Sequence, residues 1–547
     1  MPGLKLLLRT CGLATLMLPL VCCTPLTSGG GGNGASPSDT GSDAKTKTLR
    51  FVWIGDLTPL WHPAAYQTFS QAVVFYLLFN TLVKLDRDLT TIIPDLAEKW
   101  DISPDARIYT FHLRRDVRWH DGTPFTAGDV RFSFERQVLE PYRYVKYLET
   151  VDGAQDYKEG RADSISGLEL LDSHTIRVTL SLPDALFLHR LTEPTCVMIP
   201  EHVLKDTPPD VPESTKFASS SPVGTGPYKF VRYLTDQMAE FDVNPDYFKG
   251  KPQIEKVFMK RLRSEVAFAQ LESGELDLAL RLKLFGFERL TGLEDLNIIS
   301  GPGVGMTALY FICEDPRLQD RRIRQAVYHA IDRKSIVEHV FRGRARVLRG
   351  AAPALDGYAD LNPYDYNPEK SRRLLREAEF DLEPPLRIVY DQTYPSAQMI
   401  FPILEYQLRQ VGLNVRLDAM DSTAFIFRIM EQRQLLEMFG SNGGAYGVGP
   451  HVWATYFNCH RKEWQSGYLN CELDELFAKA SQVTDLDERD EVYHEVARIL
   501  NRDVPILPLW SRHDFHAATK RLGGGFKVYR DSRRTFSNIE TWTLASE

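Results

Sequence analysis

Residues 117–136, with the sequence VRWHDGTPFTAGDVRFSFER, contain side chains that many active sites use. His120 could serve as a general base, and Asp121 and Asp129 could act as acids beside it. Covalent chemistry would also require a nucleophile, but no serine or cysteine lies in a recognisable nucleophile motif near His120. The segment therefore contains acid–base groups but no nucleophile on which they could act.

The same residues also fit a turn followed by the start of a helix. Asp121-Gly122 is a common turn pair, and here it follows the strand-like sequence VRWH. The sequence TAGD predicts a capping box, in which Thr126 accepts a hydrogen bond from the Asp129 amide and Asp129 reaches back to Thr126. We therefore expect His120, Asp121 and Asp129 to be structural rather than catalytic.

The rest of the chain supplies no stronger catalytic or metal-binding motif. It contains no G-x-S-x-G nucleophile elbow, no H-E-x-x-H motif and no C-x-x-C pair. His513 and His516 are three residues apart, but they follow the strand-like sequence PILPLW, which would direct them to opposite faces. We therefore expect no catalytic residue, no bound metal and no cofactor.

Length and composition indicate a multidomain globular protein. The 547 residues are too many for one hydrophobic core, so two or three domains are expected. Apolar residues make up 43% and charged residues 25%, which is ordinary for globular domains. The formal net charge is −8 and no long basic run follows the N-terminal segment, which argues against nucleic acid as a partner.

The N-terminal segment has the features of an export signal. Lys5 and Arg9 flank the start of a short apolar run, residues 11–21, which is too short to span a bilayer comfortably. The run ends in LVCC and resembles a bacterial lipobox, in which Cys23 would be the lipidated first residue of the mature chain. Cys22 takes the place of the small residue that usually precedes it. A plain secretory signal with two incidental cysteines is the alternative.

Four later cysteines need a separate interpretation. Cys459 and Cys471 lie close together in a chain bound for an oxidising compartment, so we expect a disulfide between them. Cys196 and Cys313 are far apart, and each lies in an apolar sequence. These two could be buried free thiols or a second bridge.

Strand and helix patterns alternate along the chain. Residues 48–54, 108–114 and 174–181 alternate with period two, which predicts strands. Asp320 can cap an amphipathic helix through residues 321–341, and Asn367 followed by Pro368 can start another helix. A further helix at 403–412 is expected to end at Gly412, before a strand at 413–419. Helix, glycine and strand in this order are typical of α/β layers.

Several segments resemble the family 5 extracellular solute-binding proteins, the peptide- and nickel-type receptors of bacterial ABC importers. The longest is DLAEKWDISPDARIYTFHLRRDVRWHDGTPFTAGDVRFSFER, which contains the histidine and aspartates discussed above. It is followed, in the order of the family, by SPVGTGPYKFVRY, NPDYFKGKPQIEKV, LESGELDLA, RIRQAVYHAIDR, YNPEKSRRLL and LEYQLRQVGLNVRL. Each segment alone is weakly specific, but the ordered set is highly specific and spans about residues 51–510.

The resemblance implies an α/β fold of two lobes, the type II periplasmic-binding-protein fold, with a hinge between the lobes and an extra α/β domain. The ligand would lie in a cleft between the lobes, and closure would bury it. The expected parts are a signal peptide (1–22), a disordered lipoprotein linker (23–48), a discontinuous lobe I (49–88, 219–300 and 506–547), an added domain (89–218) and lobe II (301–505).

One departure from the family pattern bears on the kind of ligand. In oligopeptide binders, an aspartate in a Trp-x-x-Asp-Tyr region holds the α-amine of the peptide, but the corresponding residues 440–457 contain no carboxylate. Burying an ammonium group without a counter-charge costs several kcal/mol of free energy, so a peptide with a free α-amine is not the expected ligand. The same stretch resembles a Tyr-x-x-Pro-His pattern of nickel- and dipeptide-type receptors, which aligns Tyr446, Pro450 and His451.

Candidate ligand contacts come from two loops of the implied fold. In the first loop the family often has Leu-Asp-Pro, whereas this chain has PLWHP. The first loop supplies Trp53, Trp61 and His62, and the second supplies Asn442, Tyr446, His451 and Trp453. Each tryptophan could instead pack in the hinge or in a core.

Three functional hypotheses follow. The first is a monomeric, lipid-anchored receptor at the cell surface or in the periplasm, which binds a peptide-like solute and delivers it to an ABC permease. The second keeps this fold but binds a metal chelate of the nickel type, with His451 as a ligand, or a sugar-like solute. The third is an exported hydrolase, for which no catalytic motif is found.

Overall fold

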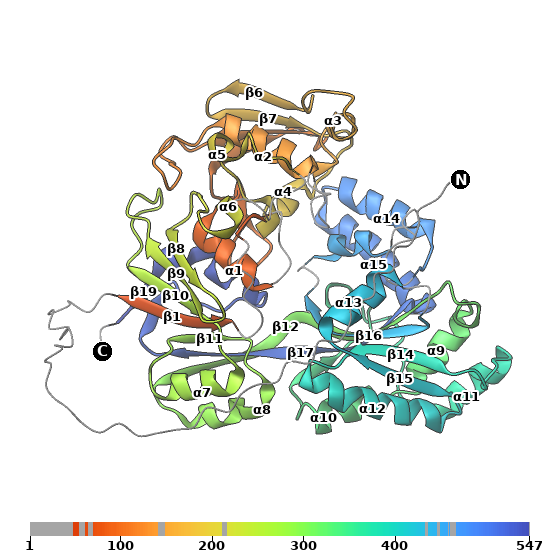
Figure 1. Ribbon diagram of the computed structural model, residues 1–547. Coiled ribbons are helices and arrows are strands. Elements are labelled where there is room, and N and C mark those ends of the chain that lie inside the picture. The colour runs from red at the N-terminus through yellow and green to blue at the C-terminus, as the bar shows by residue number, and fades with distance from the viewer. Residues whose placement is uncertain are drawn as a thin grey trace, which may run out of the picture. The chain divides into compact units, whose positions relative to one another are not determined.

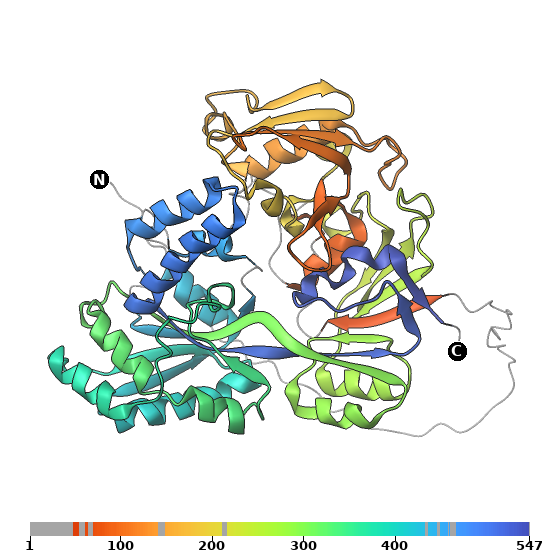
Figure 2. The ribbon, with the colours of Figure 1, turned by 180° about the vertical axis from the view of Figure 1, so that it is seen from behind.

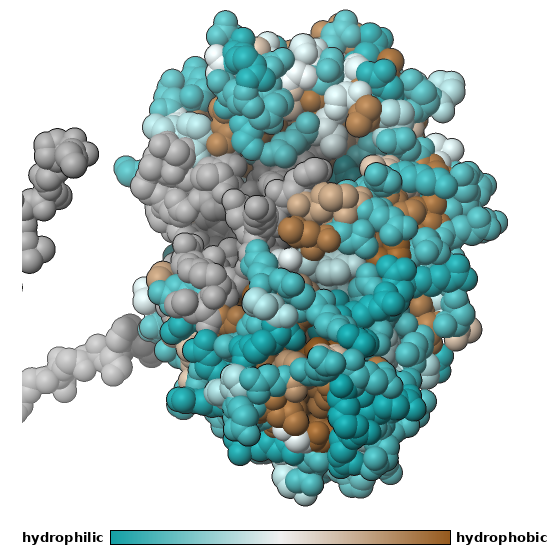
Figure 3. Space-filling model, turned by 90° about the vertical axis from the view of Figure 1, so that its right-hand side faces the viewer, coloured by the Kyte–Doolittle hydropathy of each residue, from teal (hydrophilic) through white to brown (hydrophobic). Residues whose placement is uncertain are grey.

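The computed structural model describes residues 47–53, 61–63, 69–139, 148–209, 216–432, 436–445, 449–457, 459 and 467–545. Within these residues no helix is long and apolar enough to cross a membrane. The face of the molecule in Figure 3 is mostly hydrophilic, with small apolar patches between polar residues.

One mixed sheet of eleven strands forms the framework of the described chain. The strand order is β15-β14-β16-β12-β17-β11-β1-β10-β9-β8, and β13 pairs with β17. Its strands are β1 (Thr48–Trp53), β8 (Tyr228–Leu234), β9 (Met238–Val243), β10 (Lys256–Lys260), β11 (Leu278–Leu280), β12 (Leu296–Phe311), β13 (Ala345–Val347), β14 (Leu386–Asp391), β15 (Val415–Met420), β16 (Met438–Ala445) and β17 (Ile506–Thr519).

Two long strands, β12 and β17, belong to both halves of this sheet. They pair with each other antiparallel, while β17 also pairs with β11 on one side and β12 with β16 on the other. Figures 1 and 2 show the two strands side by side, running from one half to the other. The boundary between lobe I and lobe II was expected between residues 300 and 301. It therefore falls inside β12, a strand that both halves of the sheet share.

Helices cover both faces of each half, as expected for a sheet with parallel strands. In lobe II, Ile388 belongs to a buried cluster that includes side chains of α12, whereas its neighbour Val389 belongs to another cluster with side chains of α15. In lobe I, Phe51 and Val52 are divided between two clusters in the same way. The helices of the described chain are α1 (Phe69–Leu78), α2 (Ala127–Leu139), α3 (Ala154–Lys158), α4 (Phe187–Arg190), α5 (Glu201–Leu204), α6 (Lys216–Ser219), α7 (Ser264–Glu272), α8 (Leu284–Phe287), α9 (Arg321–His329), α10 (Arg333–His339), α11 (Pro368–Glu377), α12 (Pro395–Gln410), α13 (Ser422–Glu431), α14 (Cys471–Gln482) and α15 (Leu486–Asp503).

A separate antiparallel sheet forms the core of the added domain. Its order is β4-β5-β7-β6, and its strands are β4 (Ala97–Ile102), β5 (Ile108–Leu113), β6 (Leu168–Asp172) and β7 (Thr175–Thr179). Tyr109, Phe111 and Leu113 of β5 are buried in a cluster with Phe134 of α2. The period-two strand predictions at 108–114 and 174–181 are therefore confirmed, apart from one or two terminal residues.

Several predicted helix boundaries are also confirmed. Asp320 accepts a hydrogen bond from the Arg322 amide at 2.8 Å and caps α9, and Asn367 accepts one from the Lys370 amide at 2.8 Å and caps α11. Gly412 has φ +95°, a left-handed conformation that follows the end of α12.

The single helix predicted over residues 321–341 is wrong. The structure has two helices here, α9 and α10, because the chain leaves the helical path after His329. Asp332 caps the second helix, accepting a hydrogen bond from the Ser335 amide at 3.0 Å. An aspartate inside an apolar stripe is a possible start signal, which the periodicity alone concealed.

Candidate functional site

His120 has structural partners on both ring nitrogens. Its Nδ1 accepts a hydrogen bond from the Gly224 amide at 3.2 Å, and its Nε2 donates to the Gly226 carbonyl at 3.0 Å. Burial lowers the pKa of His120 to about 4, so the ring is neutral at physiological pH. The imidazole therefore joins the added domain to the loop that enters β8.

The two aspartates of this stretch also hold local structure. Asp121 accepts a hydrogen bond from the Thr123 amide at 3.0 Å, within the predicted turn. Asp129 accepts one from the Thr126 amide at 2.9 Å, which is one half of the predicted capping box. The other half is wrong, because the Asp129 amide bonds to the Thr126 carbonyl and the Thr126 hydroxyl donates to Asp129.

The first candidate loop places Trp61 in the core of lobe I. Its ring packs against Phe230, Tyr233 and Phe241, with centroid distances of 5.4, 6.2 and 6.4 Å. The Trp61 side chain has no exposed surface, and its amide donates to the Ala218 carbonyl at 2.7 Å. In this conformation Trp61 anchors the loop, and its ring has no surface open to a solute.

The other two residues of the first loop differ in their surroundings. His62 is buried with its ring 5.5 Å from that of Phe217, and burial lowers its pKa to about 3, with a smaller effect from Arg136. Trp53 is the last residue of β1, and the Arg281 guanidinium lies 5.7 Å from the centre of its ring. Trp53 is only 4% exposed and belongs to the same buried cluster as Trp61, so the Arg281 cation lies over a ring that is mostly enclosed.

The second candidate loop was expected over residues 440–457, but its first part is wrong, because residues up to Ala445 belong to strand β16. Asn442 lies in this strand, where its backbone is paired with Thr307 of β12, and Tyr446 lies outside the described residues. His451 and Trp453 lie in a short 3-10 helix, Pro450–Thr455.

Trp453 is fully buried in a core of lobe II, where it packs on Tyr456 at a centroid distance of 5.0 Å and on Phe457 at 6.1 Å. Trp453 therefore fixes the position of the turn that carries His451.

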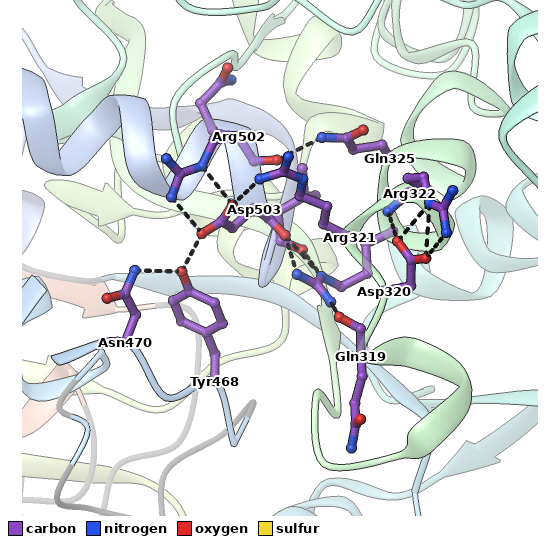
Figure 4. A network of polar contacts seen from close by, with 12 residues as sticks. Gln319, Asp320, Arg321, Arg322, Gln325, Tyr468, Asn470, Arg502 and Asp503 are labelled. Carbon is purple, nitrogen blue, oxygen red and sulfur yellow. Dashed lines mark hydrogen bonds and ion pairs between the residues drawn. The ribbon is translucent and has the colours of Figure 1, made fainter. Parts of the chain in front are cut away.

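A disulfide and a set of side-chain hydrogen bonds hold the described residues that follow this turn. A disulfide joins Cys459 to Cys471 at the start of α14, the pairing that their spacing predicted. Figure 4 shows the hydrogen bonds, in which the Tyr468 hydroxyl donates to Asp503 at 2.7 Å and Asn470 donates to the Tyr468 hydroxyl at 3.1 Å. Asp503 also pairs with Arg502 in the same network. The chain that leaves the candidate loop is therefore fixed to the end of α15.

His451 lies where all three parts of the fold meet. Its ring is 6.4 Å from that of His189 in the added domain. Burial lowers the pKa of His451 to about 3, and the positive charges of Arg190, Arg489 and Arg534 lower it further, as does His189. These residues come from the added domain, lobe II and the C-terminal segment of lobe I. Two of the arginines are themselves paired with carboxylates, Arg190 with Asp184 and Arg534 with Glu193.

A direct contact joins the added domain to lobe II beside this point. The Ala185 amide donates to the Ser481 carbonyl at 2.7 Å. Next to it, Asp184 is buried and forms an ion pair with Arg190. Burial raises the pKa of Asp184, and the charges of Arg190 and of Arg489 in α15 act in the opposite direction. No local pattern predicts this contact, because Ala185 and Ser481 are far apart in the chain.

The comparison with known proteins decides the family. A sequence model described as bacterial extracellular solute-binding proteins, family 5 Middle, matches residues 91–464. The chain belongs to this family. It is therefore a bacterial extracellular solute-binding protein, and the family consists of substrate-binding receptors rather than enzymes.

Relatives of this solute-binding protein have different ligands in their names. The dipeptide-binding protein of Escherichia coli is 27% identical over 483 residues, covering 84% of this chain and 88% of the relative. Heme-binding protein A of Haemophilus influenzae is also 27% identical, over 556 residues, covering 94% and 96%. Because two relatives of equal identity differ in ligand, overall similarity does not select the cargo.

A solved structure confirms the predicted fold class. The oligopeptide-binding protein AppA from Bacillus subtilis, in complex with a nonapeptide, matches with a TM-score of 0.78 at 21% identity. The match covers 91% of this chain and 99% of AppA. The solute-binding protein therefore has the periplasmic-binding-protein fold of family 5.

Histidine, cysteine and carboxylate side chains of the described residues were the candidates for metal and thiol chemistry. No group of three or more His, Cys, Asp or Glu side chains that could hold a metal ion occurs among the described residues. His516 accepts a hydrogen bond from the Arg281 amide at 3.2 Å. Cys196 and Cys313 are free, and burial raises their pKa values to about 12 and about 11, so both thiols stay protonated.

Proposed function

We propose that this solute-binding protein is the receptor of a bacterial ABC importer, and that it captures a peptide-like solute between its lobes and delivers it to the permease. Membership of the family carries the proposal. The position of His451 supports the proposal further, because a residue between three parts of the fold would contact a solute that these parts enclose. The protein would act as a monomer and without catalysis.

The surroundings of the second loop indicate which solutes fit poorly. Residues 440–457 contain no carboxylate, and the charges that act on His451 come from Arg190, Arg489, Arg534 and His189. A free α-ammonium group placed here would find no counter-charge in this loop. We infer that a blocked, neutral or anionic peptide-like solute is preferred, with Asn442, Tyr446 and His451 as its contacts from this loop and Trp53 from the first. Trp61, His62 and Trp453 then hold the two loops in place.

A metal chelate is the second candidate. His451 is neutral at physiological pH, and neutral imidazole is the form that binds metals. In this case His451 would complete the coordination of a chelate carried by the solute. A sugar-like solute would instead use the hydrogen-bonding groups and the aromatic faces.

Native mass spectrometry of protein purified without denaturation tests the receptor function. We expect one small molecule to be retained per chain, and its mass to correspond to a compound without a free α-amine. The His451→Ala variant should retain less of it, because one ligand contact is lost. A retained metal would favour the chelate candidate. Protein that carries nothing, and that binds no member of a broad peptide, chelate and sugar panel, would contradict the proposal.

We also propose that Cys23, outside the described residues, carries a lipid that anchors the protein to the membrane. The sequence LVCC and the segment rich in glycine, serine and threonine after it support this. Replacing Cys23 by serine should move the mature protein from the membrane fraction to the soluble fraction, as measured by fractionation and mass spectrometry. The Cys22→Ser variant is the matched control and should stay anchored, since serine also suits the position before the lipidated cysteine. Membrane attachment that survives the loss of Cys23 would show that the anchor lies elsewhere.

A further inference from the structure

The added domain is held to lobe I by contacts between their side chains and backbones. The Arg534 guanidinium of lobe I donates to the Thr192 carbonyl at 2.9 Å and to Glu193 at 2.8 Å, both in the added domain. Across the same boundary, His120 Nε2 donates to the Gly226 carbonyl at 3.0 Å. Breaking buried contacts to a charged group is costly, so we expect the added domain and lobe I to move as one body.

One hydrogen bond crosses from this body to lobe II. Ala185 precedes α4 in the added domain, and Ser481 lies in the last turn of α14 in lobe II (Figure 1). The Ala185 amide donates to the Ser481 carbonyl at 2.7 Å. When the lobes separate about the shared strands β12 and β17, this bond must break, because its donor and acceptor belong to different moving parts.

Opposite charges lie on the two sides of this hydrogen bond. Asp184 of the added domain is 3% exposed, and Arg190 of the same domain pairs with its carboxylate. Arg489 of α15 is 9% exposed, and its Nε donates to the Val483 carbonyl at 3.0 Å in the turn after α14. The charge of Arg489 acts through space on Asp184 and favours the ionised carboxylate. Lobe II therefore adds a second cation to this carboxylate when the parts meet.

A buried hydroxyl group at the same junction opposes the contact. Tyr493 lies one turn after Arg489 on α15 and is 5% exposed. Burial raises the pKa of Tyr493 to about 12, and the charges of Arg190 and Asp184 also act on its hydroxyl, which therefore faces the added domain. Among the described residues no group forms a hydrogen bond with this hydroxyl. Since water would reach it once the parts separate, its burial disfavours the contact.

The junction lies beside the second candidate loop. The His189 ring of the added domain is 6.4 Å from the His451 ring, and Tyr493 belongs to the same buried cluster as Trp453. A solute held by this loop would therefore lie on the side of the hinge where the added domain meets lobe II. A contact on this side favours the closed arrangement of the lobes.

We propose that Asp184 and Ala185 of the added domain form a latch with Ser481 and Arg489 of lobe II, and that this latch holds the cleft closed over the cargo. The latch is made by protein groups alone, so it should change the affinity for every cargo by one factor and leave selectivity unchanged. The effect on affinity rests on the proposed receptor function, whereas the contact itself can be measured without a solute.

Pulsed electron paramagnetic resonance on solute-free protein measures the latch directly. Spin labels attached after Leu182→Cys and Leu486→Cys would report the separation of the two parts, because these side chains are 63% and 73% exposed on either side of the junction. Cys196 and Cys313 are buried and protonated, so they should react slowly with the label. We expect a population with a short distance between the labels.

Two charge variants should move most of this population to longer distances. Arg489→Gln removes the cation of lobe II, and Asp184→Asn removes the carboxylate of the added domain. The double variant should lose no more than either single variant, because all three lose the same interaction. Arg498→Gln is the matched control and should keep the wild-type distances, since Arg498 is on the same helix but pairs with Asp360 inside lobe II.

The Tyr493→Phe variant guards against misfolding as an explanation. Removing the buried hydroxyl should enlarge the short-distance population several-fold, and a damaged protein would not gain a contact in this way. The latch is overturned if wild-type protein has no short-distance population. It is also overturned if both charge variants keep the wild-type distances.

Calorimetry with several N-acetylated tripeptides gives the functional readout. Arg489→Gln should weaken the binding of every peptide by the same factor, about 3- to 30-fold, and Tyr493→Phe should strengthen every one. A loss confined to some peptides would mean a direct ligand contact and would overturn the latch. If no peptide binds to any variant while the distances change as expected, the latch stands and the peptide-like cargo is contradicted.

Discussion

Replacing Arg534 by alanine is expected to lower the free energy of unfolding by about 3–5 kcal/mol. Arg534 is 3% exposed and lies in the C-terminal segment of lobe I. Its guanidinium donates to the Thr192 carbonyl at 2.9 Å and to Glu193 at 2.8 Å, both in the added domain, and is 3.6 Å from Asp531. The truncation would leave buried acceptors and a carboxylate without their cation.

Chemical denaturation at neutral pH measures this effect. The matched control is Arg373→Ala, because Arg373 forms an exposed ion pair with Glu377 on α11 and should cost no more than about 0.5 kcal/mol. A loss below about 1 kcal/mol for Arg534→Ala would mean that water or other groups replace the guanidinium. It would also show that the contacts of Arg534 with Thr192 and Glu193 add little to the attachment of the added domain to lobe I.

Acidification from pH 7 to pH 5 is expected to destabilise the protein by several kcal/mol. Burial lowers the pKa values of His62 to about 3, and of His120 and His516 to about 4. Each histidine is therefore neutral when folded but takes up a proton when unfolded below about pH 6.5. Stability is complete above pH 6.5 and falls by about 1.4 kcal/mol per pH unit for each histidine, or about 2 kcal/mol each at pH 5.

The His120→Gln variant isolates one of these contributions. Glutamine can replace both hydrogen bonds of the ring but does not titrate. The free energy of unfolding of this variant should depend less on pH, by about 2 kcal/mol between pH 7 and pH 5. The exposed His339→Gln on α10 is the control and should keep the wild-type dependence. An unchanged slope in His120→Gln would show that the folded protein can protonate this ring.

Local patterns predicted the local structure well. β5 was predictable because its apolar residues alternate, and α11 because Asn367 and Pro368 together mark a helix start. The long helix over residues 321–341 was wrong because one apolar stripe continues through α9 and α10, although Asp332 divides them. Periodicity reports which side of an element is buried, and it does not report a short interruption.

The candidate site was predictable only in part. Loop position identified His451, which the structure places among charged residues of three parts. Loop position did not distinguish a tryptophan that faces a solute from one that fixes a loop. In the structure Trp61 and Trp453 lie in cores and have no exposed surface. Arg190 and Arg489 carry no sequence signal, because an arginine has no recognisable role until folding determines its neighbours.

Calorimetry with pairs of peptides that differ only in a free or acetylated α-amine tests the proposed ligand preference most directly. We expect unblocked peptides to bind weakly or not at all, and acetylation not to reduce affinity. Tyr446→Ala and His451→Ala should weaken the binding of the blocked form. Submicromolar binding of an unblocked peptide that survives both substitutions, and that acetylation abolishes, would contradict it. The amine would then be held by a carboxylate outside the second loop.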